Sequence, residues 1–128
     1  MNPAQRRRIA NAIASAEAGT SGRIAVRIVP GGNVDAFERA KREFVRAGLH
    51  AHAGRNAALV LVAPAAKRFA AVGDRELHAR VGDRFWEELV GEMRPQFARG
   101  AVTDAIVHAV RRIGEALNAH FPLPEDRA

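Results

Sequence analysis

The feature that most constrains the fold of this chain is an unbroken run of apolar residues near its middle, Ala57–Ala63. The run reads Ala-Ala-Leu-Val-Leu-Val-Ala, so a strand built from it would be apolar on both faces. Such a strand is stable only where other elements cover both faces of its sheet. We therefore predict a central strand at 57–63, with a layer of structure on each side.

Two other segments predict the neighbours of this strand. Residues 23–29 alternate between polar and apolar side chains, with Ile24, Val26 and Ile28 on one face. This pattern is typical of a half-buried strand near a sheet edge. Residues 68–72 follow the central run after a short connection, which predicts a strand antiparallel to it.

Helical spacing of apolar residues predicts helices before, between and after the strands. The expected helices cover residues 3–18, 34–47, 83–93 and 102–119, with a helical turn over 75–78 and a bend at Pro95. Asn2 is expected to cap the first helix, and Asn33 or Asp35 the second. The second helix should bury an apolar stripe that includes Phe37. The order α-β-α-β-β-α-α predicts an α/β fold, a three-layer α/β/α sandwich with a small mixed sheet.

The chain is expected to form one domain. Its 128 residues contain no internal repeat and no linker, and a chain of this length can bury a core of its own. We expect the domain to span residues 1–128, with the core at about 3–122 and a flexible tail at 123–128.

Composition excludes several classes of protein. The absence of cysteine excludes disulfides, a thiol nucleophile and Cys-ligated zinc. No apolar run approaches the roughly 20 residues that span a bilayer, and the basic N-terminus lacks the apolar segment of a signal peptide. We therefore expect a soluble protein of the cytoplasm.

The net charge of +6 favours acidic partners. Arg6, Arg7 and Arg8 are consecutive in the first predicted helix, where they indicate either a solvated basic face or a surface for anionic lipid or phosphate. Aromatic residues are only 5% of the chain and do not alternate with the arginines, so no platform for stacking bases is expected. Because no helix-turn-helix pattern is present either, nucleic acid is not an expected partner.

Asp74 is the strongest single candidate for a functional residue. It follows the predicted strand at 68–72, and strand ends are where α/β sheets place ligands. Its carboxylate could bind a cation such as Ca²⁺, or it could be a turn residue or helix cap. Asn56 begins the central strand, so antiparallel pairing should bring it close to Asp74. Asp83, on the next helix, could supply a further oxygen or lie on a solvated face.

No recognised catalytic motif is present. The chain lacks a nucleophile elbow, a phosphate-binding glycine loop, an HExxH pattern and an EF-hand. His50 and His52 are two residues apart, but no third ligand follows at a fixed spacing, so a surface loop is the favoured interpretation.

Several segments, taken together, resemble the TPM domain family in its short bacterial form. Between about residues 8 and 122, the matching segments include 9–17, 20–22, 55–63, 72–74, 81–83, 85–86 and 117–122. The resemblance implies an α/β/α sandwich. It also implies Ca²⁺ binding, which is reported for some members, or acid phosphatase activity, which is described for a plant member. Other members act in photosystem II repair or modulate membrane proteins.

Three positions keep the polar character of the family, and on these the resemblance implies metal ligands: Asn56, Asp74 and Asp83. The chain departs from the family pattern elsewhere. Arg23 stands where Glu is common, and Ala57 where Gly is common.

The leading hypothesis is a non-enzymatic binding domain, with Ca²⁺ as a candidate ligand, that acts with a protein partner in the maintenance or assembly of membrane proteins. The first alternative is a weak metal-dependent acid phosphatase. There the cation would neutralise phosphate and activate water, with Asp74 as a ligand and Arg55 or Arg75 on the phosphate oxygens; the sequence shows no general base for this reaction. The second alternative is binding to an anionic surface through arginines 6–8, which salt should abolish.

Overall fold

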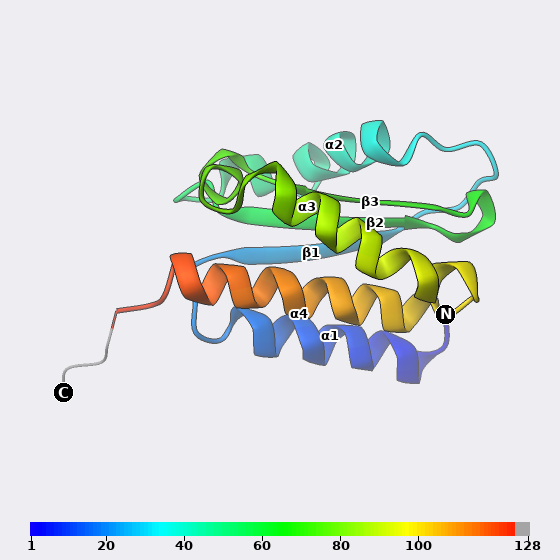
Figure 1. Ribbon diagram of the computed structural model, residues 1–128, viewed down its shortest axis with the longest axis horizontal. Helices are drawn as coiled ribbons and strands as arrows, with labels where there is room; N and C mark the ends of the chain where they lie inside the picture. The colour runs from blue at the N-terminus through cyan, green and yellow to red at the C-terminus, as the bar shows by residue number, and fades with distance from the viewer. Residues whose placement is uncertain (125–128) are drawn as a thin grey trace.

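The computed structural model describes residues 1–124, which form a sheet between two layers of helices (Figure 1). In chain order the elements are α1 (Pro3–Glu17), β1 (Arg23–Ile28), α2 (Ala36–Arg46), β2 (Ala57–Ala63), β3 (Arg68–Gly73), α3 (Arg75–Ala98) and α4 (Val102–His120), with short 3-10 turns at Leu49–Ala51 and Pro64–Ala66. Helix α2 covers one face of the sheet, and α1, α3 and α4 lie on the other. The predicted α/β class with a small mixed sheet is confirmed.

The sheet has the strand order β1-β2-β3, with β1 parallel and β3 antiparallel to β2. Every residue of β2 is buried, which confirms the predicted central strand. Because side chains alternate along a strand, Val60 and Val62 pack with α1, α3 and α4, whereas Leu59 and Leu61 pack with α2. Burying a side chain of this size contributes about 1.5–3 kcal/mol, so β2 holds both cores together.

Both predicted caps are present at the starts of the first two helices. The side chain of Asn2 accepts a hydrogen bond from the backbone N–H of Gln5 at 2.8 Å, and the side chain of Gln5 returns one to the N–H of Asn2. Asp35 caps α2 by accepting from the N–H of Glu38 at 3.1 Å. These caps satisfy N–H groups that have no partner within the helix.

One expectation about burial is wrong. Phe37 is 56% exposed, because α2 turns the stripe that begins at Ala36 and includes Ala40 toward the sheet. The Lys41 ammonium instead lies 4.9 Å from the centre of the Phe37 ring. Strand β1 is half-buried at the edge of the sheet, as predicted, and Ile28 at its end is 43% exposed.

Helix α3 is longer than predicted and is interrupted at a different residue. It covers both the predicted turn and the predicted helix, and it continues through Pro95 to Ala98. The interruption lies at Gly82, where the backbone has φ 74° and ψ 173°. Only glycine adopts this conformation at low cost.

The last described residues return to the start of the sheet. Thr20 forms a β-bridge with Pro122, and the N–H of Leu123 donates to the carbonyl of Gly19 at 3.0 Å. Of the predicted tail at 123–128, residues 125–128 lie outside the described residues. Within residues 1–124, no helix has the length and apolar character needed to cross a membrane.

Candidate functional site

Asp74 lies between β3 and α3 and connects the two elements. Its side chain accepts a hydrogen bond from the backbone N–H of Arg75 at 2.8 Å, so it is the N-cap of α3. Its own N–H donates at 2.8 Å to the carbonyl of Ala57, the first residue of β2. The residue is only 9% exposed. The helix-cap interpretation of Asp74 is therefore confirmed.

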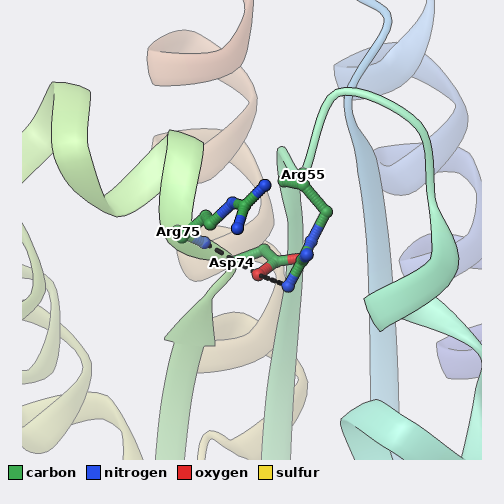
Figure 2. A network of polar contacts seen from close by, with 3 residues as sticks. All are labelled: Arg55, Asp74 and Arg75. Atoms are coloured by element: carbon green, nitrogen blue, oxygen red, sulfur yellow. Dashed lines mark hydrogen bonds and ion pairs between the residues drawn. The ribbon is translucent and has the colours of Figure 1, made fainter.

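The carboxylate of Asp74 is held by a second group, the guanidinium of Arg55 (Figure 2). The Nε atom of Arg55 donates to Oδ2 of Asp74 at 2.7 Å, and Nη2 donates to Oδ1 at 3.0 Å. This two-point contact matches the planar shapes of both groups. Arg55 has a left-handed backbone, with φ 52°, and its carbonyl accepts from the N–H of Glu76 at 3.0 Å. The pair thus connects the loop before β2 to the first turn of α3.

The electrostatics of the pair favour the charged form of both groups. Burial alone would raise the pKa of Asp74, but the hydrogen bonds from Arg55 and from the N–H of Arg75 outweigh it and lower the pKa below its ordinary value. The hydrogen bond to Asp74 raises the pKa of Arg55. Asp74 is therefore a carboxylate, not a proton donor, near neutral pH.

Asn56 is close to Asp74 along the backbone, as the pairing of β2 with β3 predicted, but its side chain has other contacts. Its Nδ2 donates to Oγ of Ser21 at 3.1 Å, and its Oδ1 is buried with no hydrogen-bond partner among residues 1–124. The carbonyl oxygen of Ser21 also lies 2.9 Å from Nε2 of His52, within hydrogen-bond distance. Asn56 therefore belongs to a polar group at the start of β1.

Side-chain alternation explains this separation. Ala58 packs in the core beneath α1, α3 and α4, and Asn56, two residues before it in the extended chain that leads into β2, has the same parity. Asp74 instead lines a shallow pocket of about 210 Å³ with Lys41 and Phe44 of α2. The two side chains are thus directed to opposite faces of the sheet.

Asp83 lies in a third group of contacts, on α3. Its side chain is 87% exposed, and its Oδ1 is 3.2 Å from Nε2 of His78. The other ring nitrogen of His78 accepts a hydrogen bond from the indole N–H of Trp86 at 3.1 Å. Sequence reasoning did not predict the contact with His78, although a spacing of five residues around a glycine permits it.

These positions bear on the predicted calcium site. Ca²⁺ takes about 6–8 oxygen ligands, but Asp74, Asn56 and Asp83 each contact a different partner. Among residues 1–124, no group of three or more His, Asp or Glu side chains is arranged to hold a metal ion. The predicted ligands do not fit the ion in this arrangement, because a cation at Asp74 would first have to displace Arg55.

The two arginines predicted to contact phosphate have different environments. Arg55 is already paired with Asp74, whereas Arg75 contacts Asp74 through its backbone and has an exposed side chain. Figure 2 shows the Arg75 side chain beside the pair. Lys41 lines the pocket at Asp74 as well, but its ammonium is paired with Glu38 at 2.9 Å. The negative charge of Glu76 also acts on Arg55.

The three N-terminal arginines do not share one surface. Arg6 lines a groove between α1 and β1, whereas Arg7 and Arg8 line a larger groove of about 840 Å³ between α1 and α4. Arg8 is paired with Asp104 at 2.6 Å. Arg111 of α4 joins Arg7 and Arg8 in the larger groove. The sequence did not indicate Arg111, because about a hundred residues separate it from α1; only parallel packing of the two helices brings it there.

Comparisons with known proteins identify related sequences and structures. The sequence profile of the TPM domain matches residues 1–116, and no curated protein sequence gives a significant match. The solved structure of the BA42 protein from the psychrophilic bacterium Bizionia argentinensis is similar, with 30% identity, a TM-score of 0.86, and coverage of 95% of this chain and 84% of that one.

Two more distant structures show the same fold. One is the N-terminal domain of the cg2496 protein of Corynebacterium glutamicum, with 14% identity, a TM-score of 0.71, and coverage of 91% of this chain and 74% of that one. The other is the N-terminal domain of a P. gingivalis protein, with 15% identity, a TM-score of 0.74, and coverage of 98% and 83%.

Proposed function

Because this chain belongs to the TPM domain family, we propose that it is a non-enzymatic binding domain that acts with a protein partner. The observation that supports the proposal is the two-point ion pair between Arg55 and Asp74. A general base works best when its pKa lies near the working pH, whereas the pKa of Asp74 is lowered. Asp74 is thus better suited to holding the start of α3 than to moving a proton.

The proposed binding function includes no calcium ion. The predicted ligands Asp74, Asn56 and Asp83 do not fit the ion as they are arranged, since both oxygens of Asp74 accept hydrogen bonds from Arg55. Calcium binding therefore stays a prediction, as does the membrane protein that the family resemblance implies as the partner.

An anionic surface is a second candidate partner. The groove between α1 and α4 favours it, because Arg7, Arg8 and Arg111 all line that groove. Its apolar lining includes Ala12 and Val107, so the groove combines positive charge with a surface of low polarity.

Hydrolysis of p-nitrophenyl phosphate separates the binding domain from the phosphatase alternative. The wild type, Asp74→Asn and the matched control Glu115→Gln, an exposed carboxylate on α4, are compared between about pH 5 and 7 with Ca²⁺ or Mg²⁺. We expect all three to hydrolyse the ester no faster than the cation in buffer. Metal-dependent turnover that is lost in Asp74→Asn and kept in Glu115→Gln would refute the proposal and establish a phosphatase.

A Ca²⁺ titration followed by amide NMR shifts tests the calcium prediction directly. We expect no saturable shifts at Asn56, Asp74 and Asp83 in the wild type up to about 10 mM Ca²⁺, because the ion would have to break the pair between Asp74 and its arginine. Saturable shifts at these amides that disappear in Asp74→Asn would establish the calcium site.

A further inference from the structure

We propose that the outer edge of β1 is a docking site where an extended acidic segment of a partner protein adds to the sheet as a fourth strand. The inference rests on the proposed binding function and names the chemistry of the partner. Among residues 1–124, no strand pairs with β1 on the side away from β2. Such an open edge presents backbone N–H and C=O groups to another chain.

The backbone groups that face outward come from the even-numbered residues of β1. In a parallel pair, successive residues direct their N–H and C=O groups alternately to the two sides. The N–H of Ile24 donates to the Glu17 carboxylate at 2.7 Å, and the carbonyl of Val26 accepts from the guanidinium of Arg27 at 3.1 Å. Both contacts lie on the outer side, and Ile28 follows the same alternation.

These contacts define the part of the edge that is open to pairing. The contact at Ile24 is already made by a carboxylate of this chain, that of Glu17. Beyond it, the outward N–H groups of Val26 and Ile28 come next along the strand, and an added strand would replace Arg27 as the partner of the Val26 carbonyl. A segment that pairs with this edge would therefore centre on residues 26–28.

A groove that is mainly apolar, with Arg6 also in its lining, runs beside this open part of the edge. The groove has a volume of about 320 Å³ and lies between α1 and β1, with Ile9 and Ile13 on the helix side and Val26 and Ile28 on the strand side. Met1, which also lines it, is 44% exposed, and Ile28 is 43% exposed. Every second side chain of an added strand would enter this groove, which calls for apolar residues at those positions.

The opposite face of β1 determines the charge of the occupant. Arg23 and Arg27 share that face, on either side of Ala25, and both are exposed. Side chains directly across from one another in paired strands lie about 4.5–5.5 Å apart. A second copy of this chain would bring arginines against arginines, whereas acidic residues would pair with them. The geometry therefore favours a segment in which acidic and apolar residues alternate.

The experiment is an amide NMR titration of the full chain with a synthetic heptapeptide, blocked at both ends, in which Glu alternates with Val or Ile. We expect saturable shifts in β1 and the facing side of α1, and slower hydrogen exchange at the N–H groups of Val26 and Ile28. Two control peptides are a version with Lys in place of Glu and a version of the same composition with its Glu residues in one block. Each should bind at least about tenfold more weakly.

Charge reversal on the protein supplies the matched variants. The double variant Arg23→Glu with Arg27→Glu changes only exposed side chains and should reverse the preference, so that the Lys peptide binds more tightly. The control Arg94→Glu with Arg99→Glu makes the same change in net charge on α3 and its C-cap. Because α3 packs on β3 and α4, this control should keep the preference of the wild type.

Three results would overturn the inference: no saturable shift up to about 1 mM acidic peptide, shifts centred away from β1, or a preference that the Arg23 and Arg27 replacements leave unchanged. The absence of a shift would indicate that Arg23 and Arg27 protect this edge from pairing with another strand. These results would leave the non-enzymatic binding function in place, whereas the turnover described above would refute that function whatever the peptide does.

Discussion

At the scale of single residues, Asp74 joins three segments of the chain. Its side chain contacts Arg55 and the N–H of Arg75, its own N–H donates to Ala57, and its carbonyl accepts from the N–H of His78 at 2.9 Å. An acidic residue at the N-cap of a helix is also favoured by the helix dipole. The strongest functional candidate in the sequence thus makes structural contacts through its side chain, its N–H and its carbonyl.

Replacing Asp74 by Ala should destabilise the fold. Loss of the N-cap costs about 1–2 kcal/mol, and Arg55 loses its partner as well. The free energy of unfolding in urea, measured for Asp74→Ala and the wild type, checks this. The comparison variant is Asp104→Ala, which breaks the exposed pair with Arg8 and should cost at most about 1 kcal/mol. Equal losses in the two variants would contradict the structural role of Asp74.

The stabilisation from Asp74 should depend on pH. The pKa of Asp74 is lowered in the folded protein, whereas an unfolded Asp titrates near 3.9. The stabilisation is therefore complete above about pH 4 and is lost as the pH falls through the pKa of the folded state. The difference in unfolding free energy between wild type and Asp74→Asn, measured by urea titration, should shrink as the pH falls below about 4. A difference that stays constant or grows on acidification would be inconsistent with a lowered pKa.

At the scale of elements, α3 is divided by a single residue. Gly82 interrupts the helix with a positive φ. Among residues 1–124, no atom other than those of its chain neighbours and the nearby helix backbone lies within 4 Å of the position that a Cβ would occupy. Space therefore does not require glycine at this position, but backbone conformation does. Gly91, in the second part of the same helix, also has open space around it, and its φ is not positive.

Replacing each of these glycines by Ala should have opposite effects. Gly82→Ala should destabilise by about 1–3 kcal/mol, because Ala resists this backbone conformation. Gly91→Ala should stabilise by about 0.5–1 kcal/mol, because Ala is the better helix former. Thermal unfolding of both variants measures whether each substitution stabilises or destabilises the protein. Stabilisation by Gly82→Ala would show that α3 runs unbroken through that position.

At the scale of the whole molecule, the arginines are distributed over separate surfaces. The groove between α1 and α4 is lined by Arg7, Arg8 and Arg111. The edge strand β1 carries Arg23 and Arg27. The net charge of +6 will attract any anionic surface at low salt. Only a comparison between variants of equal net charge separates binding at a specific groove from this general attraction.

Cosedimentation with phosphatidylglycerol vesicles makes that comparison. The double variant Arg7→Glu with Arg111→Glu should bind more weakly than Arg94→Glu with Arg99→Glu, and all binding should fall steeply as salt rises toward about 0.5 M. Equal binding by the two variants would assign the attraction to net charge and remove the groove as a second candidate.

Much of the fold is predictable from local patterns. The run at 57–63 is apolar at every position, so burial on both faces follows from its composition. Asn2 and Asp35 lie just before periodic segments, and their caps follow from hydrogen bonds within the first turn. The burial of Phe37 could not be predicted in the same way, since its place next to the buried stripe of α2 depends on how the helix rotates over the sheet.

The sequence by itself determined the order of the elements, the buried central strand and the capping role open to Asp74, because these depend on interactions within a few residues. Tertiary structure alone decided that Arg55 closes on Asp74, that Asn56 is directed to the other face, and that Arg111 joins the N-terminal arginines. The period of a strand fixes which residues share a face, but which helix covers that face depends on the packing of the entire core. The contacts of the candidate site are of this second kind, and so the predicted ligands lie in three groups rather than one.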